Sequence, residues 1–127
     1  MSQNVLGEAL VPCNSQLRTG YFRDGTCQTG GGDMGVHAVC AEVTEEFLEF
    51  SRARGNDLTT AVPQWAFPGL KPGDRWCLCA ARWQEALDAG FAPRVVLAST
   101  HVMALEFVEL KDLIEHAIDP PARKAGS

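Results

Sequence analysis

The cysteines are the residues of this sequence most able to act as nucleophiles or metal ligands. Cys77 and Cys79 lie two positions apart in the segment 71–81, KPGDRWCLCAA. Because side chains alternate along a strand, a strand here would place both sulfurs on one face. Cys79 is also expected just before a helix, where free N–H groups and the helix dipole favour a thiolate. Three kinds of site are consistent with this segment: a cysteine enzyme, a metal centre and a binding module.

In the first interpretation, Cys79 is the nucleophile of an enzyme. His37 or His101 would act as the general base, and Asp33 or Asp57 would orient the imidazole. These partners fall at expected loop or strand-end positions, where active sites are common. The structural alternative makes His101 a capping or hydrogen-bonded core residue and His37 a solvated strand residue. The sequence leaves open whether the protein is an enzyme.

In the second interpretation, the same region binds a metal, and zinc is the cofactor that suits sulfur and nitrogen ligands. The ligands would be Cys40, Cys77 and Cys79, completed by Cys27, His37 or His101. The alternative is that these cysteines are small buried hydrophobic residues. Because the cysteine count is five and the chain is expected to be cytoplasmic, we expect reduced thiols.

In the third interpretation, which the sequence favours, the protein is a small-ligand or protein-binding module without catalysis. Polar and aromatic contacts would come from Arg54, Asn56, Asp57, Trp65 and Arg82. The alternative for the Asn-Asp pair is local turn chemistry after a glycine. The alternative for Arg82 is an ion pair with an acid on its own helix.

Hydrophobic periodicity indicates the elements that would position these residues. Alternation predicts strands over 36–43, 74–79, 94–98 and 106–108, and a hairpin over 19–29 around an Asp-Gly turn. Helical spacing predicts helices over 45–54, 80–89 and 110–118, with Thr44 as an N-cap and Gly90 as a C-terminal stop. Two loops connect them: a glycine-rich loop over 29–35 and a long ordered loop over 56–70.

Three main helices are too few to cover both faces of a sheet. We therefore predict an α+β fold, a two-layer α/β sandwich, rather than a doubly wound sheet. Its small mixed sheet would carry about three helices mainly on one face, with the N-terminal hairpin added. The expected organisation is a single domain over 1–118 followed by a disordered tail over 119–127.

Composition restricts the partners and the location. The chain has 127 residues, 46% of them hydrophobic, and a formal net charge of −5. A negative charge gives no reason to expect nucleic acid or an anionic membrane as a partner. The start MSQNVLGEAL has no secretory pattern, and no segment is as apolar as a membrane span. We expect a cytoplasmic protein that binds a small molecule or another protein, in an oligomeric state that the sequence does not fix.

Four segments of the chain resemble one known family. They are TGYFRDGTCQTG, DMGVHAVCAEVTEEFLEFSRARGNDLTT, FPGLKPGDRWCLCAARWQEALDAG and APRVVLASTH, and together they cover most of residues 4–118. On these segments the chain resembles the domain-of-unknown-function 2237 family of bacteria and plants. It departs from the family pattern at 14–16 and 31–32, and neither departure touches a cysteine. The resemblance implies a two-layer α/β fold and implies no activity.

Overall fold

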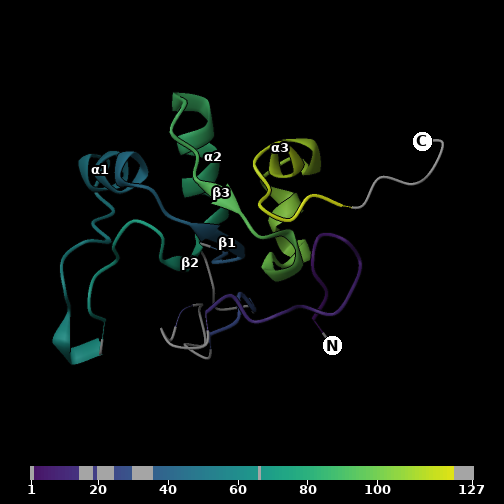
Figure 1. Ribbon diagram of the computed structural model, residues 1–127, viewed down its shortest axis with the longest axis horizontal. Coiled ribbons are helices and arrows are strands. Elements are labelled where there is room, and N and C mark those ends of the chain that lie inside the picture. The colour runs from purple at the N-terminus through teal and green to yellow at the C-terminus, as the bar shows by residue number, and fades with distance from the viewer. Residues whose placement is uncertain (1, 15–18, 20–24, 30–35, 66, 122–127) are drawn as a thin grey trace.

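The protein is described from a computed structural model, which covers residues 2–14, 19, 25–29, 36–65 and 67–121. Its centre is a three-stranded antiparallel sheet (Figure 1). The middle strand, β1 (Val39–Glu42), pairs with β2 (Arg75–Leu78) on one side and with β3 (Arg94–Val95) on the other. The register places Cys40 directly opposite Cys77. Two of the five cysteines are therefore positioned by backbone pairing alone.

Within the described residues, three α-helices and three 3₁₀ helices surround this sheet. The α-helices are α1 (Glu45–Ala53), α2 (Ala80–Ala89) and α3 (Leu110–Glu115). The 3₁₀ helices are η1 (Pro63–Trp65), η2 (Leu97–Ser99) and η3 (Val102–Glu106). Figure 1 shows the α-helices on one side of the sheet and the N-terminal segment on the other. The prediction of an α+β fold with helices mainly on one face is confirmed.

The ends of the first two helices follow from local chemistry. Thr44 Oγ1 accepts the backbone N–H of Phe47 at 3.1 Å, which satisfies one of the free donors at the start of α1. Gly90 ends α2 in the left-handed conformation, at a φ of 86°, which glycine adopts without steric cost. Both predicted helix boundaries are confirmed.

The helix-facing side of the sheet carries the main hydrophobic core. Val39 and Ala41 of β1 and Trp76 of β2 belong to this core together with Trp83 of α2 and Phe47 of α1. Trp83 is completely buried, and its Nε1–H donates to the Pro93 carbonyl at 3.1 Å. The indole therefore contributes its full apolar area without leaving its one polar group unpaired.

The opposite side of the sheet carries a second, smaller core. Its members are Cys13, Cys27, Cys40, Cys77 and Val96. Two of these cysteines come from the N-terminal segment, and the other two alternate along β1 and β2 with residues of the main core. Because both faces of the sheet are covered, its strands are apolar on both sides.

The structure differs from the sequence-based prediction in the third strand and in the last helix. The predicted strand 94–98 ends at Val95, because the backbone N–H groups of Leu97 and Ala98 donate to the Asp119 carboxylate, at 2.6 and 3.0 Å. The predicted helix 110–118 ends at Glu115, because the segment 116–118 pairs with Val95 at the sheet edge.

Two further predictions concern the short strand 106–108 and the arrangement of the sheet. The predicted strand is instead the end of η3 and the turn after it. The sheet is antiparallel throughout its described strands, whereas a mixed sheet was predicted. The predicted hairpin 19–29 and the glycine loop lie largely outside the described residues. No helix in the described ranges has the length and apolar character needed to cross a membrane.

Candidate functional site

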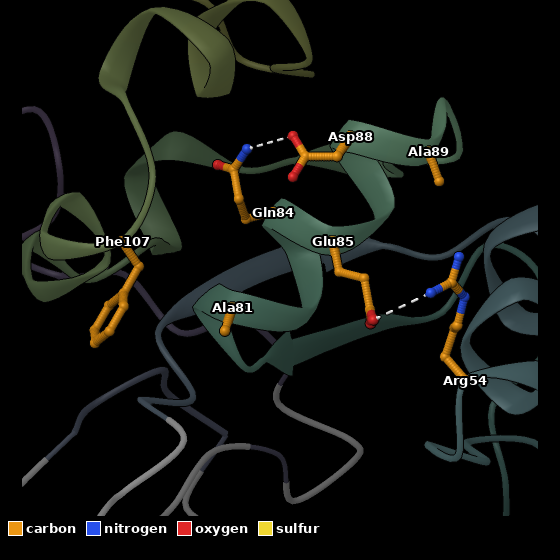
Figure 2. Close-up of a pocket in the computed structure, with 7 residues that line it drawn as sticks. All are labelled: Arg54, Ala81, Gln84, Glu85, Asp88, Ala89 and Phe107. Carbon is orange, nitrogen blue, oxygen red and sulfur yellow. Dashed lines mark hydrogen bonds and ion pairs between the residues drawn. The ribbon is translucent and has the colours of Figure 1, made fainter.

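A groove runs over the exposed face of α2 (Figure 2). Two adjoining hollows of about 500 and 510 Å³ form it, and both are lined by Gln84 and Phe107. We call it the α2 groove. Its lining residues are Arg54, Ala81, Gln84, Glu85, Asp88, Ala89, Leu105, Glu106, Phe107, Val108, Glu109, Leu110 and Asp112. Elements from both halves of the chain therefore build this surface.

The floor of the α2 groove follows from helical spacing. Ala81, Gln84, Glu85 and Asp88 recur every three or four residues, so they share one face of α2. Ala81 is small and exposed, which leaves the start of this face open. Figure 2 shows Arg54, from the end of α1, and Phe107, from the turn after η3, on opposite sides of the helix. The groove is thus open above and bounded on two sides.

Carboxylates dominate the charge of the α2 groove. Its lining contains one arginine, Arg54, and the five acids Glu85, Asp88, Glu106, Glu109 and Asp112. Arg54 pairs with Glu85 at 3.7 Å, and the neighbouring Arg82 pairs with the same carboxylate at 3.3 Å. Glu109 pairs with Lys111 at 3.4 Å, and Asp88 accepts a hydrogen bond from Gln84 at 3.0 Å. The lining therefore keeps an excess of negative charge.

Apolar side chains beside these acids are exposed. Phe107 and Leu105, which line the α2 groove, are 48% and 37% exposed. Val102 and Met103, on the same 3₁₀ helix as Leu105, are each 37% exposed. Aromatic and aliphatic side chains next to unpaired charge are typical of surfaces that bind other molecules.

The predicted ligand-binding residues fall into two places. Arg54 and Arg82 meet at the α2 groove, where Arg82 Nη1 also donates to the Arg54 carbonyl at 3.1 Å. Asn56 lies in the turn after α1, where its backbone N–H donates to the Ser51 carbonyl at 2.9 Å. Trp65 is the last residue of η1. Asn56 does not line the groove, and Arg82 lies beside it through its contacts with Arg54 and Glu85.

The Asp57 carboxylate makes its hydrogen bonds within its own loop. One carboxylate oxygen accepts the N–H and the hydroxyl of Thr59, at 2.9 and 2.7 Å, and the other accepts the hydroxyl of Thr60 at 2.6 Å. The hydrogen bonds from Thr60 and Thr59 hold the pKa of Asp57 well below its usual range. This arrangement is the local turn chemistry considered above for the Asn-Asp pair.

Backbone hydrogen bonds bring together the segments that contain three of the predicted catalytic residues, Cys79, His37 and His101. Cys79 is the N-cap of α2 and makes no capping hydrogen bond through its sulfur. The next residue, Ala80, donates its N–H to the Val36 carbonyl at 3.0 Å, and His101 donates its N–H to the Ala38 carbonyl at 2.8 Å. The segment 36–38, which contains His37, therefore connects the start of α2 with His101. Asp33 lies outside the described residues.

His101 has a structural role in its own segment. It is the N-cap of η3, and its Nδ1 accepts the backbone N–H of Met103 at 3.0 Å. Only 8% of the residue is exposed, and this burial lowers the pKa of the imidazole below its ordinary value. Because Nδ1 accepts that hydrogen bond, the proton of the neutral ring lies on Nε2, and this nitrogen can donate a hydrogen bond but cannot take up a further proton.

Four of the five cysteines are oxidised, which corrects the expectation of reduced thiols. Disulfides join Cys13 to Cys40 and Cys27 to Cys77, with Cα–Cα distances of 5.7 and 5.4 Å. The fifth, Cys79, is free and partly exposed. Cys79 leaves the face of Cys77 because β2 ends at Leu78 and the chain turns into α2. The predicted metal ligands Cys40 and Cys77 do share one cluster, and Cys13 joins it.

Sequence reasoning missed Cys13 and Phe107. The position of Cys13 depends on how the N-terminal segment crosses the sheet, and local periodicity carries no information about that path. Phe107 was expected in a strand, where alternation would hide every second side chain. The signal that was present is the interleaving of apolar and acidic residues over 102–109, VMALEFVE, which is typical of a surface segment.

The described part of the chain is thus an α+β protein with an open antiparallel sheet. Two disulfides lie on one face of this sheet, and the acidic α2 groove lies on the outer surface of α2, which packs on the opposite face. Its sequence matches the family model described as "Uncharacterized protein conserved in bacteria (DUF2237)" over residues 3–117. The chain therefore belongs to the DUF2237 family, and the resemblance noted above is confirmed. No curated protein matches the sequence.

Proposed function

We propose that the protein is a protein-binding module whose α2 groove binds a basic, amphipathic segment of a partner protein. The observation that carries this proposal is the coincidence, over one helix face, of five carboxylates with exposed apolar side chains such as Phe107 and Leu105. Acidic patches attract lysine and arginine, and exposed aromatic residues supply apolar contact area. A segment with both kinds of side chain complements both features.

The shape of the α2 groove favours a peptide over a small molecule. Small-molecule sites enclose most of their ligand's surface. The α2 groove has one helix face as its floor, and its two adjoining hollows continue past Phe107 toward the start of α3. An elongated occupant that leaves its outer face in solvent suits this surface, as in the packing of an amphipathic helix against a groove.

The chemistry of the groove indicates how such a segment would lie. Basic side chains would meet Asp88 at one end and the acids Glu106 and Asp112 at the other. An apolar side chain between them would pack on Phe107 and above Ala81. The net charge of −5 would also increase the rate of encounter with a basic partner.

A fluorescence titration with a synthetic helical peptide of lysine and leucine at amphipathic spacing tests this proposal. We expect Asp88→Lys and Phe107→Ala each to weaken binding by about tenfold or more, which is about 1.4 kcal/mol. Binding should also weaken as salt is added, because exposed charges are screened. An Asp88→Lys side chain near the C-terminus of α2 suits the helix dipole, so this variant should fold.

The matched control is Glu49→Lys, which makes the same change in net charge on an exposed position of α1 outside the groove. It should leave the affinity within about twofold, a difference of about 0.4 kcal/mol. If the two charge reversals weaken binding equally, attraction to the whole protein explains the result and the groove is rejected. Absence of binding to the unmodified protein also rejects it.

A second candidate function is thiol chemistry at Cys79, with His37 as the base, or His101 once its Nδ1 has released the Met103 N–H. It is favoured by the backbone hydrogen bonds that connect Val36 with Ala80 and Ala38 with His101. Cys79 is also the cysteine that remains free of a disulfide. This placement allows a nucleophile beside an imidazole, the pairing that activates cysteine in enzymes.

We expect iodoacetamide to modify Cys79 alone in the folded, unreduced protein, because the other four sulfurs are in disulfides. Intact-mass measurement gives the number of labels per chain, and peptide mapping identifies the labelled cysteine. The Cys79→Ser variant should take up no label. An alkylation rate of Cys79 well above that of free cysteine at the same pH supports a nucleophilic role, and an equal rate rejects this second function. Label on Cys27 or Cys77 would contradict the disulfide assignment.

We propose the cytoplasm as the location, in keeping with the expectation from the sequence. A partly exposed free thiol, as in Cys79, persists most readily in a reducing compartment. Two disulfides are more typical of an oxidising compartment. In the cytoplasm, these four cysteines would therefore be reduced for part of the time.

A further inference from the structure

The four buried cysteines lie together as one cluster of sulfur atoms on the face of the sheet opposite the helices. The sulfurs of Cys13, Cys27 and Cys77 all lie within 4.8 Å of one another, and Cys40 is bonded to Cys13. We propose that, when reduced, Cys13, Cys27, Cys40 and Cys77 form a zinc site, and that oxidation to the two disulfides releases the metal. This inference is independent of the function proposed for the α2 groove.

The spacing of the sulfurs is close to that of a tetrahedral site. A Zn–S bond of about 2.3 Å places the sulfurs of a tetrathiolate site about 3.8 Å apart. Three of the four sulfurs already lie within 4.8 Å of one another. Opening the two disulfides would move each bonded pair apart by side-chain rotation. For Cys13, Cys27 and Cys77 the remaining adjustment is about 1 Å, and rotation of the Cys40 side chain away from Cys13 would supply the fourth ligand.

The backbone holds these cysteines in place without help from the sulfur–sulfur bonds. Cys40 and Cys77 are opposite each other in the β1–β2 ladder. The Cys77 N–H donates to Thr19 Oγ1 at 2.7 Å, and the Cys40 N–H donates to Thr100 Oγ1 at 3.2 Å. The Cys13 N–H donates to the Gly25 carbonyl at 2.8 Å, two residues before Cys27. These bonds can persist after reduction and keep the four thiols converging.

Burial makes the cluster a closed site. Cys27 and Cys40 are fully buried, and Cys77 and Cys13 are 1% and 4% exposed. Four protein sulfurs in a buried tetrahedron are typical of structural zinc rather than catalytic zinc, which keeps one position open. In the reduced protein without metal, the cluster would hold four thiols in an apolar core. With zinc bound, the metal would cross-link the same four cysteines that the two disulfides join in the oxidised protein.

The exchange between the two states balances. A zinc tetrathiolate centre carries a charge of −2; its oxidation yields two disulfides, one Zn²⁺ and four electrons. A small-molecule disulfide accepts two electrons per bond that is reduced, so two equivalents are required and four small-molecule thiolates leave. In the reverse reaction, two equivalents of a dithiol become two cyclic disulfides, or two equivalents of a phosphine take the oxygen of two water molecules and become phosphine oxide. The four thiols then bind one Zn²⁺ and release four protons to the solvent. Cys79 takes no part in either direction.

The test is to reduce the full-length protein with a phosphine under nitrogen, add zinc and measure its native mass. We expect one zinc per chain in the wild type and in the matched control Cys79→Ser. Zinc affinity should fall by at least tenfold in Cys27→Ser and in Cys13→Ser. Two equivalents of oxidised glutathione should release the zinc, detected with a colorimetric chelator, and leave one free thiol per chain.

Two further measurements keep the outcome decisive if a serine variant does not fold. The visible spectrum of the reduced wild type with Co²⁺ should be that of a tetrahedral tetrathiolate site, and its circular dichroism should show a folded protein. A reduced wild type that retains no zinc overturns the inference, whether or not it is folded. A site that needs Cys79, or one that survives in the disulfide form, also overturns it.

Discussion

Removal of the Cys27–Cys77 disulfide is expected to lower the free energy of unfolding of the oxidised protein by about 4 kcal/mol. The two cysteines are 50 residues apart, so the cross-link restricts a long segment of the unfolded chain. The loss is a large part of the total stability of an ordinary domain, about 5–15 kcal/mol. For a chain of this length it corresponds to a fall in Tm of about 15 °C.

The change is the double substitution Cys27→Ala and Cys77→Ala, measured by urea denaturation without metal. The double variant avoids leaving an unpaired buried thiol, which would be able to exchange with the other disulfide. Cys79→Ala is the control, because its sulfur is unbonded and partly exposed, and should shift the free energy of unfolding by less than about 1 kcal/mol. A double variant as stable as this control would mean that the disulfide does not restrict the unfolded chain.

Trp83→Ala is expected to lower the free energy of unfolding by about 3–5 kcal/mol. Trp83 is the largest completely buried side chain, and it lies in the main core between α2 and the sheet. The substitution leaves a cavity and also removes the hydrogen bond from Nε1 to the Pro93 carbonyl. Its ring also meets His116 edge-on, with centroids 5.5 Å apart, so the contact with the end of α3 is lost as well.

Trp83→Phe separates these contributions. Phenylalanine keeps much of the apolar volume and loses the indole N–H, so we expect a smaller loss of about 1–3 kcal/mol. Thermal and urea denaturation of both variants provide the comparison. If the alanine variant loses less than the phenylalanine variant, packing around Trp83 is not what stabilises this part of the core.

Most of the elements that surround the sheet were predictable because their signals are local. Thr44, before two glutamates, predicts the start of α1, and Gly90, after an amphipathic segment, predicts the end of α2, because both signals act through nearby hydrogen bonds. The third strand was predicted too long because its end depends on Asp119, more than 20 residues away in sequence. A side chain that distant cannot be inferred from periodicity.

The candidate sites were predictable only in part, for the same reason. Arg54 and Arg82 were selected for their chemistry, and the structure does bring them together. The rim of the α2 groove depends on how η3 follows the buried His101 and exposes Phe107, which is a tertiary arrangement. The cysteine pairing was equally out of reach: any one of the five cysteines could be the free one, each choice leaves four cysteines with three pairings, and spacing does not select among them.

The order of the paired cysteines along the chain has a consequence for proteolysis. Cys27 lies between Cys13 and Cys40, and Cys40 lies between Cys27 and Cys77, so the two covalent loops overlap. A single cut at any peptide bond between residues 13 and 77 therefore leaves its two fragments joined by at least one disulfide. A protease that cuts the oxidised protein within this region, including the long loop over 56–70, would add one water molecule and leave a two-chain molecule that keeps every residue. The fragments would separate only after reduction.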